Sequence, residues 1–347
     1  MRFDDAMAGA VEPRPAAGED LLRRVVEMAT RAPSVHNTQP WRFVAGSGRV
    51  DVYADRSRQL TVLDPGGRQL VVSCGAAVGM ARLAVRAFGF GCSVELLPDP
   101  AGVDHLARLR VGGPEPATAD ELALAREIGR RRTVRDRFAP ARLGAAARTA
   151  LSRDAEVEQS WLQWVDSGED RAVLAVLADR ADRIERADAA LRAELAGWLR
   201  DGDEGDGIPV GVLPAVPPAL RASDVPLRDF DSYGVGDDGG PVEPDPQRLP
   251  LPAERPDLAV LCTRYDGPTS WLQAGQATTR LLLRATALGI AASPLGQVLD
   301  LPWTRRRLRA ELGLTGHPQL VLRLGHARLD GPRSPRRPVD DVLTQGR

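Results

Sequence analysis

The chain contains no lysine, because all 46 of its basic residues are arginine. This absence excludes Schiff-base chemistry and a lysine general base. The 47 acidic residues balance the arginines and leave a formal net charge of −1. Because nucleic-acid and membrane-surface proteins rely on an excess of basic charge, we expect neither partner. An anion-binding site must therefore come from a local group of arginines.

Cysteine is also scarce, with three residues in 347. Cys74, Cys92 and Cys262 stand singly in apolar stretches, which argues against a disulfide framework and a zinc site. The four histidines share no metal-ligand spacing. No signal-peptide pattern is present, and the least polar long stretch, 285–299, is broken by Pro294 and too short to cross a membrane. We expect a cytoplasmic protein without a metal.

Hydrophobic periodicity, together with glycine and proline breaks, predicts a mixed chain of helices and strands. The helix over 69–87 is apolar on most sides, so we expect it to be buried. The first two strands flank a glycine turn and form a predicted hairpin. The predicted helices are 20–31, 69–87, 120–130, 170–200 (as one or two helices), 270–288 and 303–311. The predicted strands are 41–45, 50–54, 92–97, 106–111, 157–165, 258–263 and 319–324.

A repeat with a constant offset of 200 residues connects two parts of the chain. Residues 74–93 align without a gap to residues 274–293, and six of the twenty positions are identical. Chance agreement between helices rich in alanine, leucine and glycine is the alternative explanation. Both copies, however, read as a buried helix that ends at a glycine and leads into a strand, and this shared order favours a duplication.

Residues 201–256 differ in composition from the rest of the chain. They hold 11 of the 28 prolines and 8 of the 34 glycines in 56 residues. A segment this long without predicted secondary structure is typical of a functional lid or of a disordered linker.

The segment from Pro33 to Trp41, with sequence PSVHNTQPW, is the first candidate for chemistry. Two prolines stiffen a run of hydroxyl and amide side chains at the end of a predicted helix. Such a segment suits the polar edge of a heteroaromatic ring. The alternative is an ordinary turn in which Asn37 and Gln39 bind their own backbone.

A run of arginines between residues 130 and 137 is the second candidate. Arg131, Thr133 and Arg135 occupy alternate positions, so in an extended segment their side chains share one face. Two guanidinium groups and a hydroxyl on one face suit a phosphate. The alternative is a solvated run in a chain already rich in arginine.

Both motifs resemble those of a known family. The pattern P-S-x-x-N-x-Q-P-W at residues 33–41 resembles the signature of the FMN-dependent nitroreductase superfamily. The pattern R-x-T-x-R at residues 131–135, followed by Phe138, resembles its R-x-S-x-R-x-F phosphate motif. Their order along the chain is the reverse of that in ordinary members, which the internal repeat explains. The arrangement is similar to the Acg-like subfamily of dormancy-associated NAD(P)H nitroreductases.

The resemblance, which spans about residues 20–343, implies an α+β nitroreductase fold built from two tandem halves that form an intrachain pseudo-dimer. We expect a flexible N-terminal arm over 1–18, a first half over 19–118 and a second half over 119–347 that includes a lid at 201–256. Each motif occurs once. The resemblance therefore implies one FMN per chain, and whether the pseudo-dimeric monomer dimerises further stays open.

The resemblance also assigns residues to the two ends of FMN. Arg131, Thr133 and Arg135 are expected at the phosphate and ribityl end. An arginine of the C-terminal tail is expected to return to the phosphate, and we favour Arg336 over Arg337.

The isoalloxazine ring is expected to meet the other motif. Pro33, Ser34 and Asn37 would contact it, while Val35 stands where many relatives carry a second serine. The turn Ser293-Pro-Leu295-Gly296 resembles the one whose backbone approaches the flavin near N5.

The resemblance implies an oxidoreductase that passes hydride from NAD(P)H through FMN to a nitroaromatic or quinone-like small molecule, without a catalytic side-chain acid or base. The alternative is an FMN-sequestering or storage protein in which the segment 201–256 covers the flavin and NAD(P)H turnover is slow or absent. A weaker third interpretation is a flavin-free interaction module.

Overall fold

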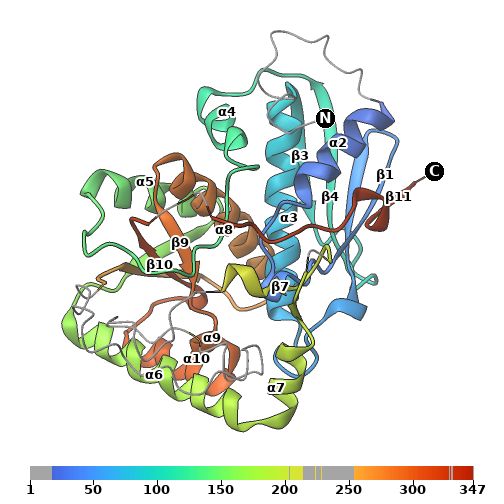
Figure 1. The fold of residues 1–347 in the computed structure, drawn as a ribbon. Coiled ribbons are helices and arrows are strands. Elements are labelled where there is room, and N and C mark those ends of the chain that lie inside the picture. The colour runs from blue at the N-terminus through green and yellow to red at the C-terminus, as the bar shows by residue number, and fades with distance from the viewer. Residues whose placement is uncertain are drawn as a thin grey trace.

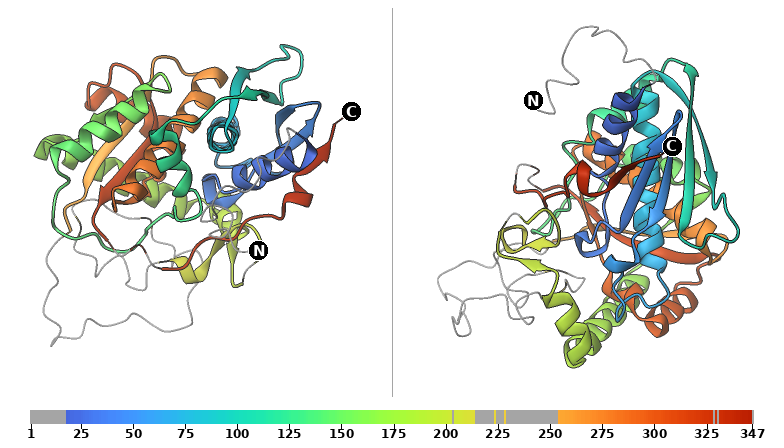
Figure 2. Two further views of the ribbon diagram at one scale, coloured as in Figure 1. Left: turned by 90° about the horizontal axis from the view of Figure 1, so that it is seen from above. Right: turned by 90° about the vertical axis from the view of Figure 1, so that its right-hand side faces the viewer.

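The computed structural model describes residues 18–202, 204–213, 223, 228, 254–327, 329 and 331–346. Two β-sheets flank a central pair of long helices, α3 (Arg68–Ala87) and α8 (Pro268–Ala287), as Figures 1 and 2 show. The predicted N-terminal arm, apart from Gly18, and most of the predicted lid at 201–256 lie outside the described residues. The molecule is therefore a mixed α and β fold organised around one helix pair.

The first sheet has five strands in the order β11-β1-β2-β4-β3. Strands β1 and β2 are antiparallel and form the predicted hairpin, whose two turn residues, Ser47 and Gly48, both have positive φ. This conformation matches the turn to the twist of the strands. The strands are β1 (Trp41–Gly46), β2 (Arg49–Ala54), β3 (Phe90–Leu96), β4 (His105–Pro114) and β11 (Leu343–Gln345).

The second sheet has four antiparallel strands in the order β5-β8-β10-β9. This order repeats the pairing β1-β2-β4-β3 of the first sheet, strand for strand. The two sheets therefore share one topology, as a duplicated chain requires. The strands are β5 (Ser160–Trp164), β8 (Asp257–Thr263), β9 (Ala291–Pro294) and β10 (His317–Gly325).

The central helices carry the repeat. The bounds of α8 are those of α3 shifted by 200 residues, and each helix is followed by a glycine with positive φ, Gly89 or Gly289. A Cβ atom at Gly75 would overlap the carbonyl of Leu272, and one at Gly275 would overlap the carbonyl of Val72. The repeated glycines therefore let the two helix backbones touch. Helix α3 has the length and apolar composition of a membrane span, but most of it is buried inside the protein.

The remaining helices surround this centre. Residues 170–200, expected as one or two helices, form two, because the Asp188 carboxylate caps the start of α7 by accepting from the backbone N–H of Ala190 and Leu191. Helix α5 was not predicted; its N-cap, Gly144, provides no side-chain signal. These helices are α2 (Glu19–Ala29), α4 (Ala119–Arg126), α5 (Ala145–Glu156), α6 (Gly168–Ala187), α7 (Ala189–Ala196), α9 (Gln297–Asp300) and α10 (Pro302–Glu311).

The C-terminal tail links the two sheets. After β10, residues 331–346 run from the second sheet to the first, where β11 pairs in parallel with β1, with Phe43 opposite Leu343 (Figure 1). This strand was not predicted. The boundary expected between residues 118 and 119 stays a prediction, and the tail crosses it by adding a strand to the first sheet. The tail also passes beside the motif at 33–41.

Candidate functional site

The motif at residues 33–41 has a strained backbone. His36, Asn37 and Gln39 have φ values of 46°, 54° and 50°, in the region that favours glycine. The Ser34 hydroxyl accepts a hydrogen bond from the Gln39 N–H at 3.0 Å, which helps to fix this conformation. Strain of this kind persists where the surrounding structure imposes it, and it gathers at functional sites.

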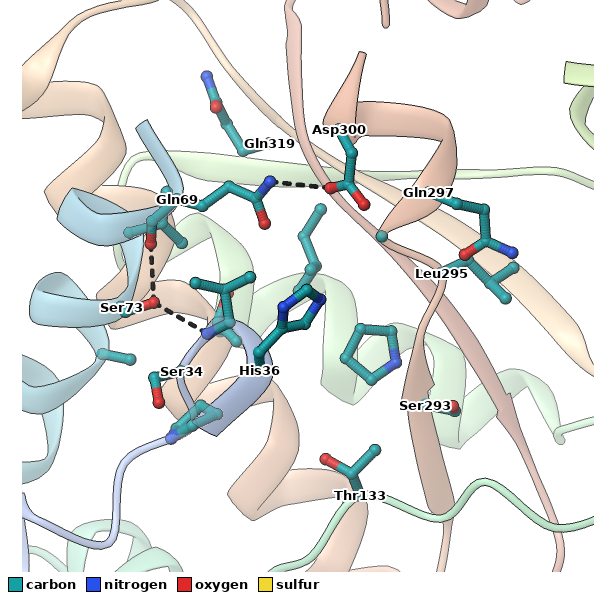
Figure 3. A pocket seen from close by; sticks show the side chains of 18 of the residues that line it. Ser34, His36, Gln69, Ser73, Thr133, Ser293, Leu295, Gln297, Asp300 and Gln319 are labelled. Atoms are coloured by element: carbon teal, nitrogen blue, oxygen red, sulfur yellow. Dashed lines mark hydrogen bonds between the residues drawn. The ribbon is translucent and has the colours of Figure 1, made fainter. Parts of the chain in front are cut away.

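A cavity lies beside the motif, between the two halves (Figure 3). Its walls come from residues 33–36, from α3 and α8, from the segment 133–135 and from the turn 293–297. The backbone N–H of Val35 donates to the Ser73 hydroxyl of α3 at 3.2 Å, which fastens the motif to the cavity wall. Seven of the ten predicted site residues line this cavity: Pro33, Ser34, Val35, Thr133, Arg135, Leu295 and Gly296.

A second hollow adjoins the cavity, and the two share Pro33, Ser34, Thr133 and Arg135. The other three predicted residues, Asn37, Arg131 and Arg336, line this second hollow. We call it the arginine hollow, because among the described residues six arginines and no acidic residue line it. These arginines are Arg31, Arg131, Arg132, Arg135, Arg333 and Arg336. The structure thus brings the predicted residues together from both halves.

Three arginines of the hollow, the buried Arg131 and the half-buried Arg135 and Arg336, lack an opposite charge among the described residues. Within the described part of the chain, no carboxylate pairs with Arg131, Arg135 or Arg336. Burial lowers the pKa of Arg131 and Arg135 to about 10, with a contribution from Arg228 at Arg135. The Nε atoms of Arg131 and Arg336 are buried and have no hydrogen-bond partner among the residues that the structure describes. An uncompensated buried charge is costly, so this arrangement suits an anionic ligand.

Asn37 is engaged with other parts of the chain. Its amide nitrogen donates to the carbonyls of Gly207 at 2.8 Å and Pro335 at 3.1 Å, and its amide oxygen accepts from Arg336 at 3.0 Å. Asn37 lines the arginine hollow and not the larger cavity. Its expected contact with a flavin ring stays a prediction, and the observed contacts point elsewhere.

The two candidate tail arginines separate in space. Arg336 lines the arginine hollow. The Arg337 guanidinium instead donates to the carbonyls of Gln39, at 3.3 Å, and Asp341, at 3.0 Å. Arg337 is not among the residues that line the cavity or the arginine hollow. The geometry therefore favours the first of the two alternatives.

His36 is a cavity residue that the sequence analysis did not assign. Its ring points into the cavity (Figure 3), and its buried Nδ1 atom has no hydrogen-bond partner in the described part of the chain. Burial, with Arg228 and Arg135 nearby, lowers the pKa of His36 to about 3, so the imidazole is neutral at physiological pH. Its place inside the motif, between Val35 and Asn37, is the signal that could have identified it.

Part of the proline-rich segment reaches the cavity. Arg228 lines it and forms ion pairs with Glu185 at 2.9 Å and Asp300 at 2.6 Å. Asp300 also accepts from the Gln69 amide at 2.8 Å (Figure 3). Burial raises the pKa of Glu185 to about 8. Sequence reasoning missed this polar wall because its members come from four separate segments.

A fully buried ion pair holds the backbone of residues 136–138, which follow Arg135. The Arg323 guanidinium pairs with Glu254 at 2.7 Å and donates to the Asp136 carbonyl at 2.9 Å. The second oxygen of Glu254 accepts from the Phe138 N–H at 2.8 Å. The backbone after Arg135 is therefore anchored to β10.

Comparisons with known proteins identify relatives of this chain. A model of the nitroreductase family matches residues 248–326. "Putative NAD(P)H nitroreductase Rv3131" of Mycobacterium tuberculosis is 32% identical over 346 residues, covering 93% of this chain and 91% of that protein. "Putative NAD(P)H nitroreductase acg" of the same organism is 29% identical, covering 93% and 95%.

Among solved structures, a putative nitroreductase from Anabaena variabilis matches with a TM-score of 0.51 at 10% identity, covering 93% of this chain and 91% of that one. This match shows a shared fold and confirms the predicted fold class. The resemblance to Acg-like proteins is confirmed as well. From the identity and coverage of these relatives, the chain belongs to the nitroreductase family.

Proposed function

We propose that this protein binds one FMN and acts as an NAD(P)H-dependent oxidoreductase of nitroreductase type. The observation that carries the proposal is the group of Arg131, Arg135 and Arg336 beside the cavity, one buried and two half-buried, with no carboxylate partner in the described part of the chain. A phosphate would supply the missing negative charge and accept from the buried Nε atoms of Arg131 and Arg336. Thr133, which lines both hollows, would bind at the junction of phosphate and ribityl chain.

The isoalloxazine ring is assigned to the cavity, between residues 33–35 and the turn at Leu295 and Gly296. A Cβ atom at Gly296 would approach no protein atom more closely than 3.5 Å, so the protein itself does not require a glycine there. The open space beside this backbone fits a ring edge that approaches the chain closely. The residues present therefore fit FMN at both of its ends.

The chemistry that FMN supplies when bound is acceptance of hydride from NAD(P)H and transfer of electrons to a nitroaromatic or quinone-like acceptor. The protein binds and orients FMN, and it excludes water from the cavity. Apolar side chains such as Val72 and Leu282 line the cavity and keep water from its walls. His36 stays neutral and can hydrogen-bond without adding charge. No side-chain acid or base is assigned.

The relatives support the reductant of this proposal, and the cysteines support the compartment. Two M. tuberculosis relatives carry NAD(P)H nitroreductase in their names, from which we take NADH or NADPH as the reductant. All three cysteines are free thiols, which suits the reducing cytoplasm. One chain supplies both motifs, so the site needs no second subunit.

A second candidate function rests on the contacts of Arg228. This residue belongs to the proline-rich segment, lines the cavity and is held there by Glu185 and Asp300. A cavity bordered in this way favours retention of FMN over exchange of substrates. The second candidate is therefore an FMN-sequestering protein with little or no turnover.

The first experiment is a visible spectrum of the purified protein, followed by anaerobic addition of NADPH and then NADH. Flavin bands that bleach within seconds support the oxidoreductase. Flavin bands that persist with both nucleotides, but bleach on photochemical reduction, support the sequestering protein. A colourless protein that takes up no added FMN contradicts both.

The arginine hollow has its own test. Arg131→Ala removes a buried guanidinium and should cost about 1.5–3 kcal/mol of FMN binding, which is roughly a 10- to 100-fold rise in Kd. The matched control is Arg284→Ala, because Arg284 already pairs with Asp154 at 2.6 Å. Fluorescence titration of both variants measures the difference. Equal losses in the two variants would place the phosphate elsewhere.

A further inference from the structure

We propose that Asn37 is a positioning residue, whose side-chain amide holds the C-terminal tail so that Arg336 reaches the arginine hollow. This role replaces the flavin-ring contact that the family motif implies. The proposal rests on the proposed FMN function and deepens it, because it assigns Asn37 to the phosphate end of the ligand.

The hydrogen-bonding capacity of the Asn37 amide supports this role. Its two N–H groups point to the carbonyls of Gly207 and Pro335, at 2.8 and 3.1 Å. An amide nitrogen has two donors, so none remains for a ring edge. Asn37 is also 7% exposed, which leaves its side chain little freedom to turn toward the cavity.

The backbone at Asn37 reinforces this orientation. The N–H of Gly207 donates to the Asn37 carbonyl at 3.2 Å, so residues 37 and 207 exchange two hydrogen bonds. The φ of 54° at Asn37 is a strained conformation that these contacts maintain. The side chain therefore faces the tail because its backbone is fixed from both sides.

The chemistry of the contact with Arg336 explains why an amide is present. Arg336 donates to the Asn37 amide oxygen at 3.0 Å and to the carbonyls of Ser334, Pro335 and Arg31. All these acceptors are uncharged, so they fix the guanidinium without neutralising it. An aspartate at position 37 would place a negative charge beside Arg336 and oppose a phosphate. An amide holds the arginine and leaves its charge for the ligand.

Gln39, two residues after Asn37 in the motif, makes similar contacts. Its amide donates to the Gly205 carbonyl at 2.8 Å and accepts from the Arg337 N–H at 2.9 Å. Both amides of the motif thus clamp the turn 205–207 and the tail 335–337 together. Arg337 is the neighbour of Arg336 but lines neither hollow, so it provides a matched control.

The experiment compares FMN with riboflavin, which has the same ring and lacks the phosphate. The full-length protein is stripped of flavin and titrated with each ligand, as wild type and as Asn37→Ala, Arg336→Ala, the double variant and Arg337→Ala. We expect Asn37→Ala to weaken FMN binding about tenfold and riboflavin binding less than about twofold. The double variant should bind FMN no more weakly than Arg336→Ala, because Asn37 acts only through Arg336 and both substitutions therefore remove the same contact with the phosphate. Arg337→Ala should bind both ligands as wild type does.

Equal weakening of FMN and riboflavin by Asn37→Ala would assign Asn37 to the ring and overturn the proposal. Additive losses in the double variant would overturn it as well. Asn37→Asp keeps the size of the side chain and serves if the alanine variant does not fold; it should weaken FMN and spare riboflavin. A wild-type protein that binds neither ligand would contradict the proposed function itself, whereas wild-type FMN binding with an unselective Asn37→Ala variant contradicts only this inference.

Discussion

Two groups of arginines in this molecule have opposite surroundings. The arginine hollow holds Arg131, Arg135 and Arg336 without a carboxylate in the described part of the chain. The paired group, on the C-terminal half of α3 and the facing part of α8, has a carboxylate for every guanidinium. The paired group consists of Arg82, Arg86, Arg280 and Arg284. Arginine therefore stabilises the fold where a carboxylate pairs with it. Where the described chain provides no carboxylate, we propose that arginine binds a ligand.

The repeat relates the paired group to the cavity that adjoins the arginine hollow. Leu282 lines the cavity, and its counterpart 200 positions earlier is Arg82, which pairs with Glu158. Where one half offers an apolar wall, the other half thus has an ion pair. This difference supports the proposal of one FMN per chain, because an ion pair at that position leaves no apolar surface for a second ring.

The largest effect is expected from a break in the paired group. Asp154 is 2% exposed and accepts from Arg280 at 2.9 Å and Arg284 at 2.6 Å. Asp154→Asn leaves two partly buried guanidinium groups without their main partner, so we expect a loss of about 3 kcal/mol in the free energy of unfolding. Urea unfolding measures this loss, and FMN affinity should stay unchanged. Asp120→Asn is the control, because Asp120 lies at the exposed edge of the paired group and the substitution should lower the free energy of unfolding by under about 1 kcal/mol. Equal losses in the two variants would contradict the comparison.

An intermediate effect is expected at His36, which burial keeps neutral, with a smaller contribution from Arg228 and Arg135. Its native pKa of about 3 lies below the ordinary value of 6.5, so the unfolded chain takes up a proton first as the pH falls. Stability is therefore lost between pH 6.5 and 3, by up to about 2 kcal/mol at pH 5. In flavin-free protein, His36→Gln should remove this part of the acid loss. The measurement is urea unfolding of both proteins at pH 7 and pH 5. An equal loss of unfolding free energy in the two proteins would show that His36 protonates normally in the native state.

The smallest effect has the opposite sign. Because the buried charge of Arg131 has no counter-charge among the described residues, Arg131→Met should raise the free energy of unfolding of the flavin-free protein by about 1 kcal/mol. Arg284→Met, in the paired group, should lower it. Urea unfolding of both variants tests the comparison directly, and destabilisation by both substitutions would show that Arg131 has a structural partner.

The sequence was sufficient to predict the central parts of the fold. The offset of 200 residues identified α3 and α8, whose bounds repeat at that spacing, because buried helices that cross at glycine leave a strong local pattern. Helix α5 was missed because it begins without a capping side chain. Strand β11 was missed because its three residues depend on pairing with β1, about 300 positions away.

The ten residues predicted for the site lie together in the structure, although their role in binding FMN stays a prediction and their contacts could not be predicted. Arg131 and Arg135 share one hollow, as their alternate spacing predicted. The contacts of Asn37 with Gly207 and Pro335 span 170 and 298 positions, so no local pattern could indicate them. Arg323 and Glu254 form their buried pair across 69 positions and were missed for the same reason.

The tail that carries Arg336 also sets the order in which the site can assemble during synthesis. Asn37 and Arg336 lie 299 positions apart, so the motif at 33–41 leaves the ribosome long before the tail that it clamps. The hollow cannot be complete until the tail has emerged and β11 has paired with β1. Under the proposed function, loading of the cofactor is then a late event, because a nascent chain that stalls before residue 336 has no complete arginine hollow.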